Sequence, residues 1–307
     1  MQLKAVRPLP AGLGYALAAP VLYGLGLPIS KLLLGRTDPL VLTGLMQWGA
    51  GLGMAALYLP RRWSGQAGKG LHGRDWVWFA TSLVFGGSAA SVLMMLGLST
   101  TSASTASLLL NLESVFTAVI AWLVFREAFS RELLLGLLAL SAGGVLLCLQ
   151  EGSGVVTFSW GAVAVVGACL AWAISSNLSR HFAGRDPLQV AAARGIAAGS
   201  INLGLAHLFH APYPDLGSGM AALGVGIVSE GLAVACYYIA LHRLGAATAG
   251  TCFALAPLVG AVAAVAWLHD PITVPLLLAA GLMLPGLWLC LQGHGGRLEE
   301  NRRRESL

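Results

Sequence analysis

Three ionisable side chains stand alone inside long apolar stretches of the sequence: Glu113, Arg194 and Glu230. A charged group at the centre of a membrane-spanning helix costs roughly 2.5–3.5 kcal/mol on insertion scales, so it is expected to face a cavity or a partner rather than lipid. A glutamate in this setting can bind a proton or another cation, and an arginine can bind a carboxylate through two hydrogen bonds. The sequence therefore predicts a polar pathway inside a membrane protein.

Glu113 and Glu230 each lie on a helical face of small residues, where a substrate or another helix can approach closely. Residues four or seven positions apart share one face of a helix, which places Ala106 and Thr117 beside Glu113, and Gly226 beside Glu230. Two interpretations stay open for each glutamate. It is either a substrate-binding or proton-binding group on the pathway, or a structural carboxylate hydrogen-bonded to a neighbouring helix.

Arg194 has three interpretations from the sequence alone. Its guanidinium can bind the carboxylate of a substrate, or it can form a buried ion pair with Glu113 or Glu230. It can also extend its side chain towards the membrane surface, because it lies only about two turns into its span.

Seven further polar or aromatic residues are candidates for lining the pathway: Tyr23, Gln47, Trp48, Asn111, Trp172, Asn177 and Tyr237. Aromatic rings can stack on a substrate, although each residue taken singly is better explained by helix packing or interfacial anchoring. The five cysteines lie inside apolar runs without the spacing of a metal or redox pair, so neither a metal site nor a cofactor is expected. No nucleotide-binding P-loop occurs in the sequence, which argues against coupling to ATP.

The helices that position these residues follow from composition. Of the 307 residues, 57% are hydrophobic and 10% are charged, against roughly 25% charged in soluble domains. We therefore predict an all-α membrane protein with ten transmembrane helices, at about 12–34, 39–59, 75–98, 102–125, 132–150, 158–179, 187–208, 219–241, 246–268 and 273–292. The net charge of +5 is spread over short clusters, so no binding of nucleic acid is expected.

Lysine and arginine positions predict the orientation. With a cytoplasmic N-terminus, all 18 basic residues except Lys31, Arg36 and Arg194 fall on the cytoplasmic side. This bias predicts that both termini are cytoplasmic. The polar tail at 293–307 is expected to be disordered, and the arginines at 302–304 would lie near anionic membrane lipid.

The sequence also repeats itself. A shift of 143 residues places Ala103, Thr105, Ala106, Leu112, Ala118 and Ala121 on Ala246, Thr248, Ala249, Leu255, Ala261 and Ala264. A shift of 149 residues places Gly12 on Gly161 and Ser30 on Ser179. We therefore predict two repeats, at 12–150 and 157–292. Each holds five spans, an odd number, so the halves would be inverted relative to each other, with a substrate site between them.

These repeats resemble the EamA family of the drug/metabolite transporter superfamily. The motifs that carry the resemblance are Leu112-Glu113-Ser114-Val115-Phe116-Thr117, Ala121-Trp122 and Arg126-Glu127 in the first repeat, and Leu255-Ala256-Pro257 and His269-Asp270-Pro271 in the second. The resemblance covers nearly everything from Gly12 to Gln292. It implies a ten-helix, inverted-repeat carrier of small metabolites, often an exporter of amino acids or related compounds.

The favoured function is therefore secondary transport of a small amphipathic metabolite across the bacterial inner membrane, by alternating access, with protons as the expected coupling ion. Two other classes stay open. One is a passive channel, facilitator or small-molecule sensor. The other is a membrane-embedded enzyme acting on lipid-linked groups, which would need a nucleophile or metal set that the sequence does not supply, so a non-enzymatic role is expected.

Overall fold

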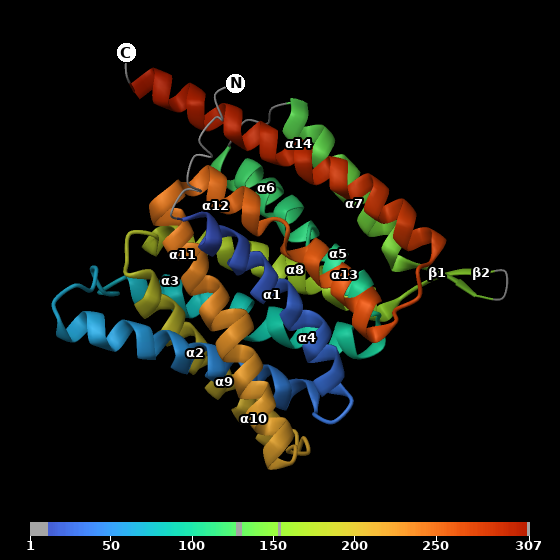
Figure 1. The fold of residues 1–307 in the computed structure, drawn as a ribbon, viewed down its shortest axis with the longest axis horizontal. Helices are drawn as coiled ribbons and strands as arrows, with labels where there is room; N and C mark the ends of the chain where they lie inside the picture. Colours follow the sequence, from blue (N-terminus) through green and yellow to red (C-terminus); the bar gives the residue numbers. More distant parts are fainter. Residues whose placement is uncertain (1–11, 127–130, 153–154, 306–307) are drawn as a thin grey trace, which may run out of the picture.

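The computed structural model describes residues 12–126, 131–152 and 155–305, which form helices apart from one short hairpin (Figure 1). The first half contains α1 (Leu13–Leu34), α2 (Pro39–Trp63), α3 (Asp75–Ser82), η1 (Leu83–Ala89), α4 (Ala90–Thr100), α5 (Ala103–Leu109), α6 (Leu112–Phe125) and α7 (Arg131–Cys148). The second contains α8 (Trp160–Ser179), η2 (Arg180–Phe182), α9 (Pro187–Leu208), α10 (Leu216–Val225), η3 (Gly226–Leu232), α11 (Ala233–Leu244), α12 (Ala246–Phe253), α13 (Ala256–Leu268) and α14 (Val274–Glu305).

Seven of the described helical stretches are long and apolar enough to cross a membrane, judged by length and composition. Two shorter apolar helices, at Ala256–Leu268 and Val274–Cys290, accompany them. The chain is therefore a multi-pass membrane protein. Each of the ten predicted segments is helical over most of its length, but α9 and the shorter helices fall outside the seven. That all ten cross the membrane stays a prediction.

Two local expectations differ from the structure. The halves are joined by an antiparallel hairpin of β1 (Leu149–Gly152) and β2 (Val155–Phe158), whereas the sequence predicted an all-α protein. Valine and threonine, which favour strands, dominate the second of these segments. Helix α14 also continues to Glu305, where the sequence predicted a disordered tail from 293, because the tail is rich in Leu, Glu and Arg, all good helix formers. Residues 306–307 lie outside the described residues.

Helices α2 and α9 begin with the same local construction in the two halves. Asp38 and Asp186 are the N-cap residues, and a proline follows each at the first helical position. Asp38 Oδ1 accepts a hydrogen bond from the backbone N–H of Leu40 at 2.8 Å, and Asp186 Oδ1 accepts one from Leu188 at 2.9 Å. The aspartate satisfies an N–H that the helix leaves unpaired, and proline needs no partner there.

Irregular backbone also recurs at the offset of 143 residues. Both η1 and η3 are π-helical turns, and their first residues, Leu83 and Gly226, are 143 positions apart. The helices that follow are both interrupted, between α5 and α6 and between α12 and α13. Arg126 and His269 then end these helices in the left-handed conformation, with φ of 55° and 53°. The two halves therefore share departures from regular helix as well as sequence.

The contacts between helices are also repeated when the two halves of the chain are exchanged. Helix α2 packs against α9, and α7 packs against α14, which pairs helices at equivalent places in the two halves (Figure 1). Helix α1 contacts α11 and α13 of the second half, and α8 contacts α4 and α6 of the first. Each of these contacts has its counterpart when the halves are exchanged, so the two halves form one interlocked bundle.

Glycines set how closely these helices approach. A Cβ atom on Gly226 would overlap the backbone carbonyl of Met46, so η3 lies directly on the backbone of α2. A Cβ on Gly195 would lie 2.5 Å from the nitrogen of Gly51, which brings α9 equally close to α2. In a membrane, helices associate through such close packing because lipid supplies no hydrophobic driving force between them.

We expect Gly226→Ala to destabilise the protein by about 1–3 kcal/mol, because the new methyl group must displace the α2 backbone. Gly224→Ala is the matched control. It lies two residues away in the same helical stretch, and a Cβ there meets no atom within 4 Å, so it should be neutral or slightly stabilising. The measurement is thermal unfolding of both variants in detergent; equal Tm values would contradict the close contact.

Candidate functional site

A cavity of about 670 Å³ lies between the two halves. Its walls come from α1, α2, η1, α4, α6, α8, α9, η3, α11 and α12, so both repeats contribute. At one end it is lined by Arg180, Phe182, Ala183 and Arg185 of the α8–α9 junction. Seven of the residues singled out in the sequence line it: Tyr23, Gln47, Glu113, Trp172, Arg194, Glu230 and Tyr237.

Glu113 lies in the first turn of α6, directly after the interruption that separates α5 from α6. Its Oε1 accepts a hydrogen bond from Ser176 Oγ of α8 at 3.3 Å. The interruption places this carboxylate at the start of a helix, where the helix dipole favours negative charge. The carboxylate is partly buried and borders the cavity.

Arg194 extends from α9 into the same cavity, which Glu113 and Glu230 also line. Among the described residues, no direct ion pair joins it to either carboxylate. Its guanidinium lies against the backbone of Gly86, where a Cβ atom would collide with Nη2. The three charges thus meet around one space without being paired directly, which leaves room for a ligand between them.

Glu230 belongs to the π-helical turn η3. A π-helical turn widens the helix locally and is frequent at functional sites. Because Gly226 lets η3 rest on the α2 backbone, the widened turn is held against a rigid neighbour. Glu230 is therefore positioned by backbone contact on the α2 side and is left facing the cavity.

A buried hydrogen-bond network stabilises the other π-helical turn, η1. Asn202 Nδ2 donates to Gln47 Oε1 at 2.8 Å and to the carbonyl of Gly87 at 3.2 Å. Gln47 Nε2 donates to the same carbonyl and to Ser91 Oγ. A π-helical turn leaves carbonyl groups with weakened helical partners, and these side chains supply replacements in a region without bulk water.

Trp172 contributes to the same turn from α8. Its Nε1 donates to the carbonyl of Gly86 at 3.0 Å, while its ring lines the cavity. Its polar group is therefore used for structure, and its ring is left as an apolar wall. This combines the two interpretations that the sequence left open.

Three of the singled-out residues are not among those lining the cavity. Trp48 Nε1 donates to Ser200 Oγ at 3.1 Å, and Asn111 Nδ2 donates to the carbonyl of Leu108 at 2.9 Å. Asn177 Nδ2 donates to the carbonyl of Ala173 at 2.9 Å. All three bond to neighbouring residues in the helix packing. The sequence selected them because they lie within predicted spans, but such a position does not tell which face of the helix points inward.

Sequence reasoning did not select an aromatic cluster that lines the cavity beside Tyr23. The ring of Phe253 lies 5.2 Å from that of Tyr23 and 5.0 Å from that of Tyr237, and Tyr238 lies 5.9 Å from Tyr237. Phe253 ends α12 directly before its interruption. The interruption between α12 and α13 could have pointed to Phe253, and only the repeat offset could have predicted that interruption from the sequence.

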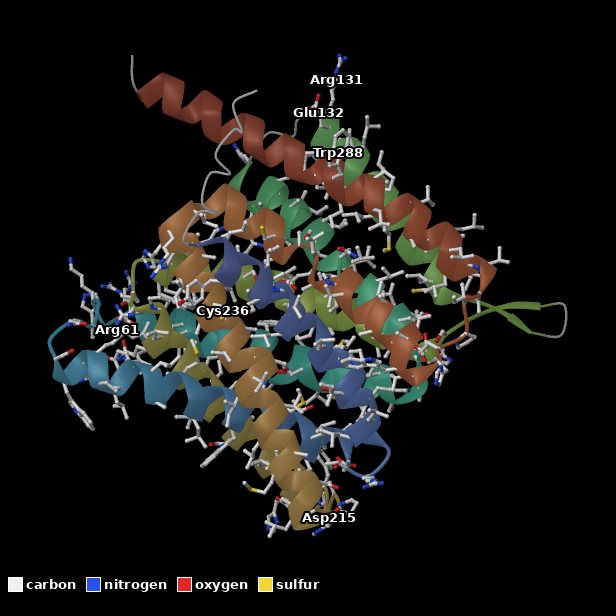
Figure 2. The ribbon with its side chains drawn as sticks, in the orientation of Figure 1. Arg61, Arg131, Glu132, Asp215, Cys236 and Trp288 are labelled. Carbon is white, nitrogen blue, oxygen red and sulfur yellow. The ribbon has the colours of Figure 1, made fainter. Side chains whose placement is uncertain are left out.

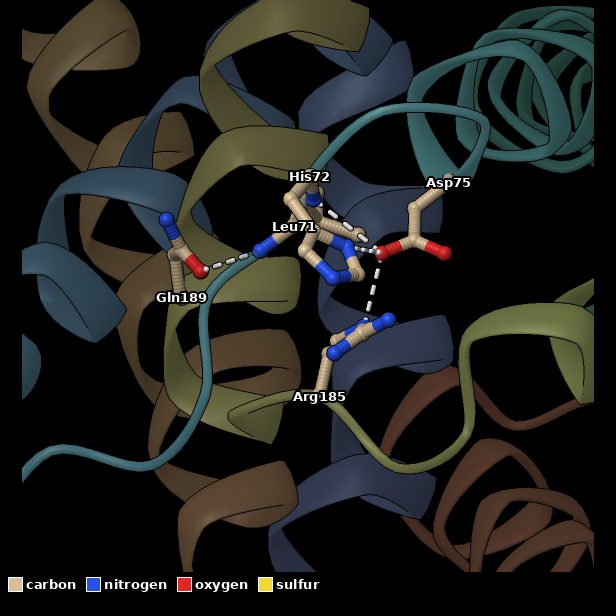
Figure 3. Close-up of polar contacts among 5 residues, drawn as sticks. All are labelled: Leu71, His72, Asp75, Arg185 and Gln189. Carbon is tan, nitrogen blue, oxygen red and sulfur yellow. Dashed lines mark hydrogen bonds and ion pairs between the residues drawn. The ribbon is translucent and has the colours of Figure 1, made fainter.

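The mouth of the cavity is tied to the segment between α2 and α3 (Figure 3). Asp75 Oδ2 forms an ion pair with Arg185 Nε at 2.7 Å and accepts a hydrogen bond from His72 at 3.0 Å. Gln189 Oε1 accepts one from the backbone N–H of Leu71 at 3.1 Å. These contacts join the first half of the chain to the α8–α9 junction of the second.

The described residues contain no cluster of three or more His, Cys, Asp or Glu side chains that could hold a metal ion. The cavity has side chains of both charge signs, Glu113, Glu230 and Arg194, and an aromatic wall. A bundle of apolar helices around such a cavity defines the chain as a multi-pass membrane protein with an internal cavity.

The particular family follows from comparison with known proteins. The model of the EamA-like transporter family matches residues 10–149 and 159–292, which is most of the chain in two stretches. The chain therefore belongs to the EamA-like transporter family. The resemblance read from the motifs is confirmed.

Two relatives support this assignment. An "Uncharacterized transporter" of Methanothermobacter thermautotrophicus is 30% identical over 207 residues, which is 65% of this chain and 60% of that protein. "Uncharacterized protein PA1977" of Pseudomonas aeruginosa is 32% identical over 196 residues, covering 64% of this chain and 67% of that one. A solved crystal structure with a TM-score of 0.63 and 20% identity covers 94% of this chain and 99% of its own, and shows the fold alone.

We expect Asn202→Leu to destabilise the protein by about 1–3 kcal/mol, because it leaves the buried Gln47 Oε1 without its donor and removes one of the two side-chain donors to the Gly87 carbonyl of η1. Gln47→Leu should have a similar effect, and the double variant should cost clearly less than the sum, because the two side chains bond to each other. Ile201→Leu, on an exposed face of α9, is the control and should stay within about 0.5 kcal/mol. Thermal unfolding gives all four values, and strict additivity would contradict a shared network.

Proposed function

We propose that this chain is a secondary transporter that exports small amphipathic metabolites across the bacterial inner membrane by alternating access. The observation that carries the proposal is the cavity between the halves, with Glu113, Arg194 and Glu230 around its middle and a mouth beside the α8–α9 junction. Opposite charges suit a substrate that itself carries both, such as an amino acid, and the aromatic wall suits an apolar side chain. Export and the metabolite class come from the family.

The opposite end supports alternating access because it is held shut by contacts between helices. Lys31 Nζ, at the end of α1, donates to the carbonyl of Thr101 at 2.8 Å and to that of Leu98. Asp270 Oδ2 accepts a hydrogen bond from the backbone N–H of Ser104 at 2.8 Å. To open that end, these few polar contacts would have to break. The present mouth at the α8–α9 junction would have to close through new contacts.

The helix contacts that recur when the two halves are exchanged support two inverted five-helix repeats at 12–150 and 157–292. In inverted repeats, rocking of one half against the other exposes a central site to each side in turn. The shared π-helical turns and helix interruptions lie at equivalent places in both halves, where such a motion would need compliant backbone. Ten crossings and two cytoplasmic termini are part of this proposal.

We propose that the proton is carried by Glu113. Its carboxylate borders the cavity and has one hydroxyl donor, Ser176, which can stay bonded when the acid is protonated because the hydroxyl can also accept. A proton bound here would remove one charge from the cavity and weaken its hold on a cationic group of the substrate. This links proton entry to substrate release without an enzymatic step.

Counterflow in proteoliposomes tests the function. Vesicles loaded with a candidate metabolite should accumulate a labelled trace of it transiently and saturably, because a carrier exchanges bound substrate across the membrane. We expect this for at least one member of a panel of amino acids and related compounds. A passive channel or facilitator pore would show flux without transient accumulation, and that result would overturn the proposal.

Glu113→Gln should retain counterflow but lose accumulation driven by a pH gradient, because glutamine keeps the shape and polarity of the site but binds no proton. Glu132→Gln is the control, since Glu132 is exposed on α7 and does not line the cavity. Both variants are compared with the parent protein over a range of external pH. Unchanged pH-driven accumulation in Glu113→Gln would remove it from the coupling role.

The proposed orientation makes the present mouth cytoplasmic. In Figure 2, Asp215 lies at one margin of the molecule, and Arg61 and Arg131 lie at two others. In a variant without the native cysteines, Ser179→Cys should react with an impermeant maleimide in inside-out vesicles, because Ser179 lines the cavity near its mouth. Tyr213→Cys, between α9 and α10, should react only in right-side-out vesicles; the reverse pattern would contradict the orientation.

A further inference from the structure

A second, smaller lobe continues from the cavity beyond Glu230. It has a volume of about 60 Å³ and shares five lining residues with the main cavity: Tyr23, Gln47, Ser91, Trp172 and Glu230. Its remaining walls come from α1, α2, α4, α5, η3 and α13. The lobe is too small for a metabolite, but it has room for an ion with a few water molecules.

Hydroxyl oxygens line this lobe and are left as acceptors. Ser30 Oγ donates its proton to the carbonyl of Gly26, and Ser229 Oγ donates to Val225, each at 2.7 Å. Thr43 also lines the lobe, and its Oγ1 donates to the carbonyl of Pro39 at 2.7 Å. A hydroxyl that donates to its own helix still has lone pairs for another ligand.

The side-chain nitrogen donors at the lobe are already bonded to the protein. Both bonds that Gln47 Nε2 makes go to protein acceptors, Gly87 and Ser91, and the N–H of Trp172 is bonded to Gly86. Glu230 is the one charged side chain among the described residues that line the lobe. The lobe is therefore rich in acceptors and negative, which suits a cation and disfavours an anion.

Ser107 gives an independent indication that a ligand is missing. Its side chain is 0% exposed, it lines the lobe, and its Oγ has no hydrogen-bond partner in the structure. A buried hydroxyl without a partner costs free energy, so it normally signals a water or an ion. Gly260 allows this oxygen to lie against α13, because a Cβ there would lie 2.6 Å from it.

Both helix interruptions also border the lobe. Leu110, at the break between α5 and α6, and Ala256 and Pro257, at the start of α13, are among its walls. Interrupted membrane helices expose backbone carbonyl groups, and such groups coordinate small cations in transporters built from repeats. The lobe thus combines a carboxylate, hydroxyl oxygens and irregular backbone, which together form the oxygen-rich surroundings that a hard cation requires.

We propose that this lobe binds one Na⁺ ion, held by the carboxylate of Glu230 and the hydroxyl of Ser107. Binding of the ion follows from the lobe alone, whereas its role as a coupling ion rests on the proposed transport function. Because Glu230 borders both spaces, the same carboxylate cannot hold the ion and a cationic group of the substrate equally well. Entry of Na⁺ would therefore favour release of the substrate, which gives an exchange of the two.

The test is thermal unfolding of the purified protein in detergent, in NaCl and in KCl at equal ionic strength. A ligand that binds the folded state raises Tm as its concentration passes Kd, so we expect stabilisation that is specific to Na⁺. Glu230→Gln should lose this shift. Equal Tm values in the two salts for the parent protein would overturn the proposal.

Ser107→Ala is the sharper variant, because its hydroxyl makes no hydrogen bond whose loss could harm the fold. It should need about tenfold more Na⁺ to reach the same shift, as expected for one lost ligand. Ser88→Ala is the matched control: Ser88 Oγ is also buried and without a partner, but it does not line the lobe. A Na⁺ response that is unchanged in Ser107→Ala, or equally weakened in Ser88→Ala, would overturn the assignment to this lobe.

Counterflow separates the two proposals. Na⁺-specific stabilisation without counterflow of any metabolite would leave the ion site standing and overturn the transport function. Counterflow and pH-driven accumulation that proceed equally in NaCl and KCl, together with equal Tm values, would leave transport standing and overturn the Na⁺ site.

Discussion

The structure depends on one constraint: charged groups inside a lipid bilayer must be kept away from lipid. Glu113, Arg194 and Glu230 sit on helices that are otherwise apolar, and each of them borders the same internal cavity. The bundle can hold that cavity only because other helices pack very closely, through glycines such as Gly226, which rests on the backbone of α2. Tight packing on one side of these helices therefore makes the open space on the other side possible.

Irregular backbone is the second consequence of the same constraint. Each π-helical turn and each interruption leaves carbonyl groups that water cannot reach, so side chains must satisfy them. For η1 this is done by Gln47, Asn202 and Trp172, three polar residues that would otherwise be costly within a membrane. The equivalent turn η3 instead carries Glu230. The two halves thus have the same backbone irregularity in different roles. The turn η1 is stabilised by neighbouring polar side chains, and the turn η3 carries a charged residue.

The open end of the cavity and the opposite end are held by different kinds of contact. At the mouth, an ion pair between Asp75 and Arg185 joins the halves, supported by backbone hydrogen bonds. At the other end, Lys31 bonds to backbone carbonyls after α4, and Asp270 caps α5. Such contacts are few and polar, so they can be exchanged for others at modest cost, unlike the glycine contacts in the middle of the bundle.

The sequence by itself determined the membrane class, the helical segments and the repeat, because these depend on local hydropathy and on residue order. It also determined that Glu113, Arg194 and Glu230 needed a polar setting, since their cost in lipid is a property of the side chain. Only the tertiary structure decided that they share one cavity, that Trp48 and Asn177 do not line it, and that Ser107 lines the smaller lobe beside it. The reason is that a linear pattern specifies distance along a helix, whereas facing another helix depends on rotation and on packing between halves far apart in the chain.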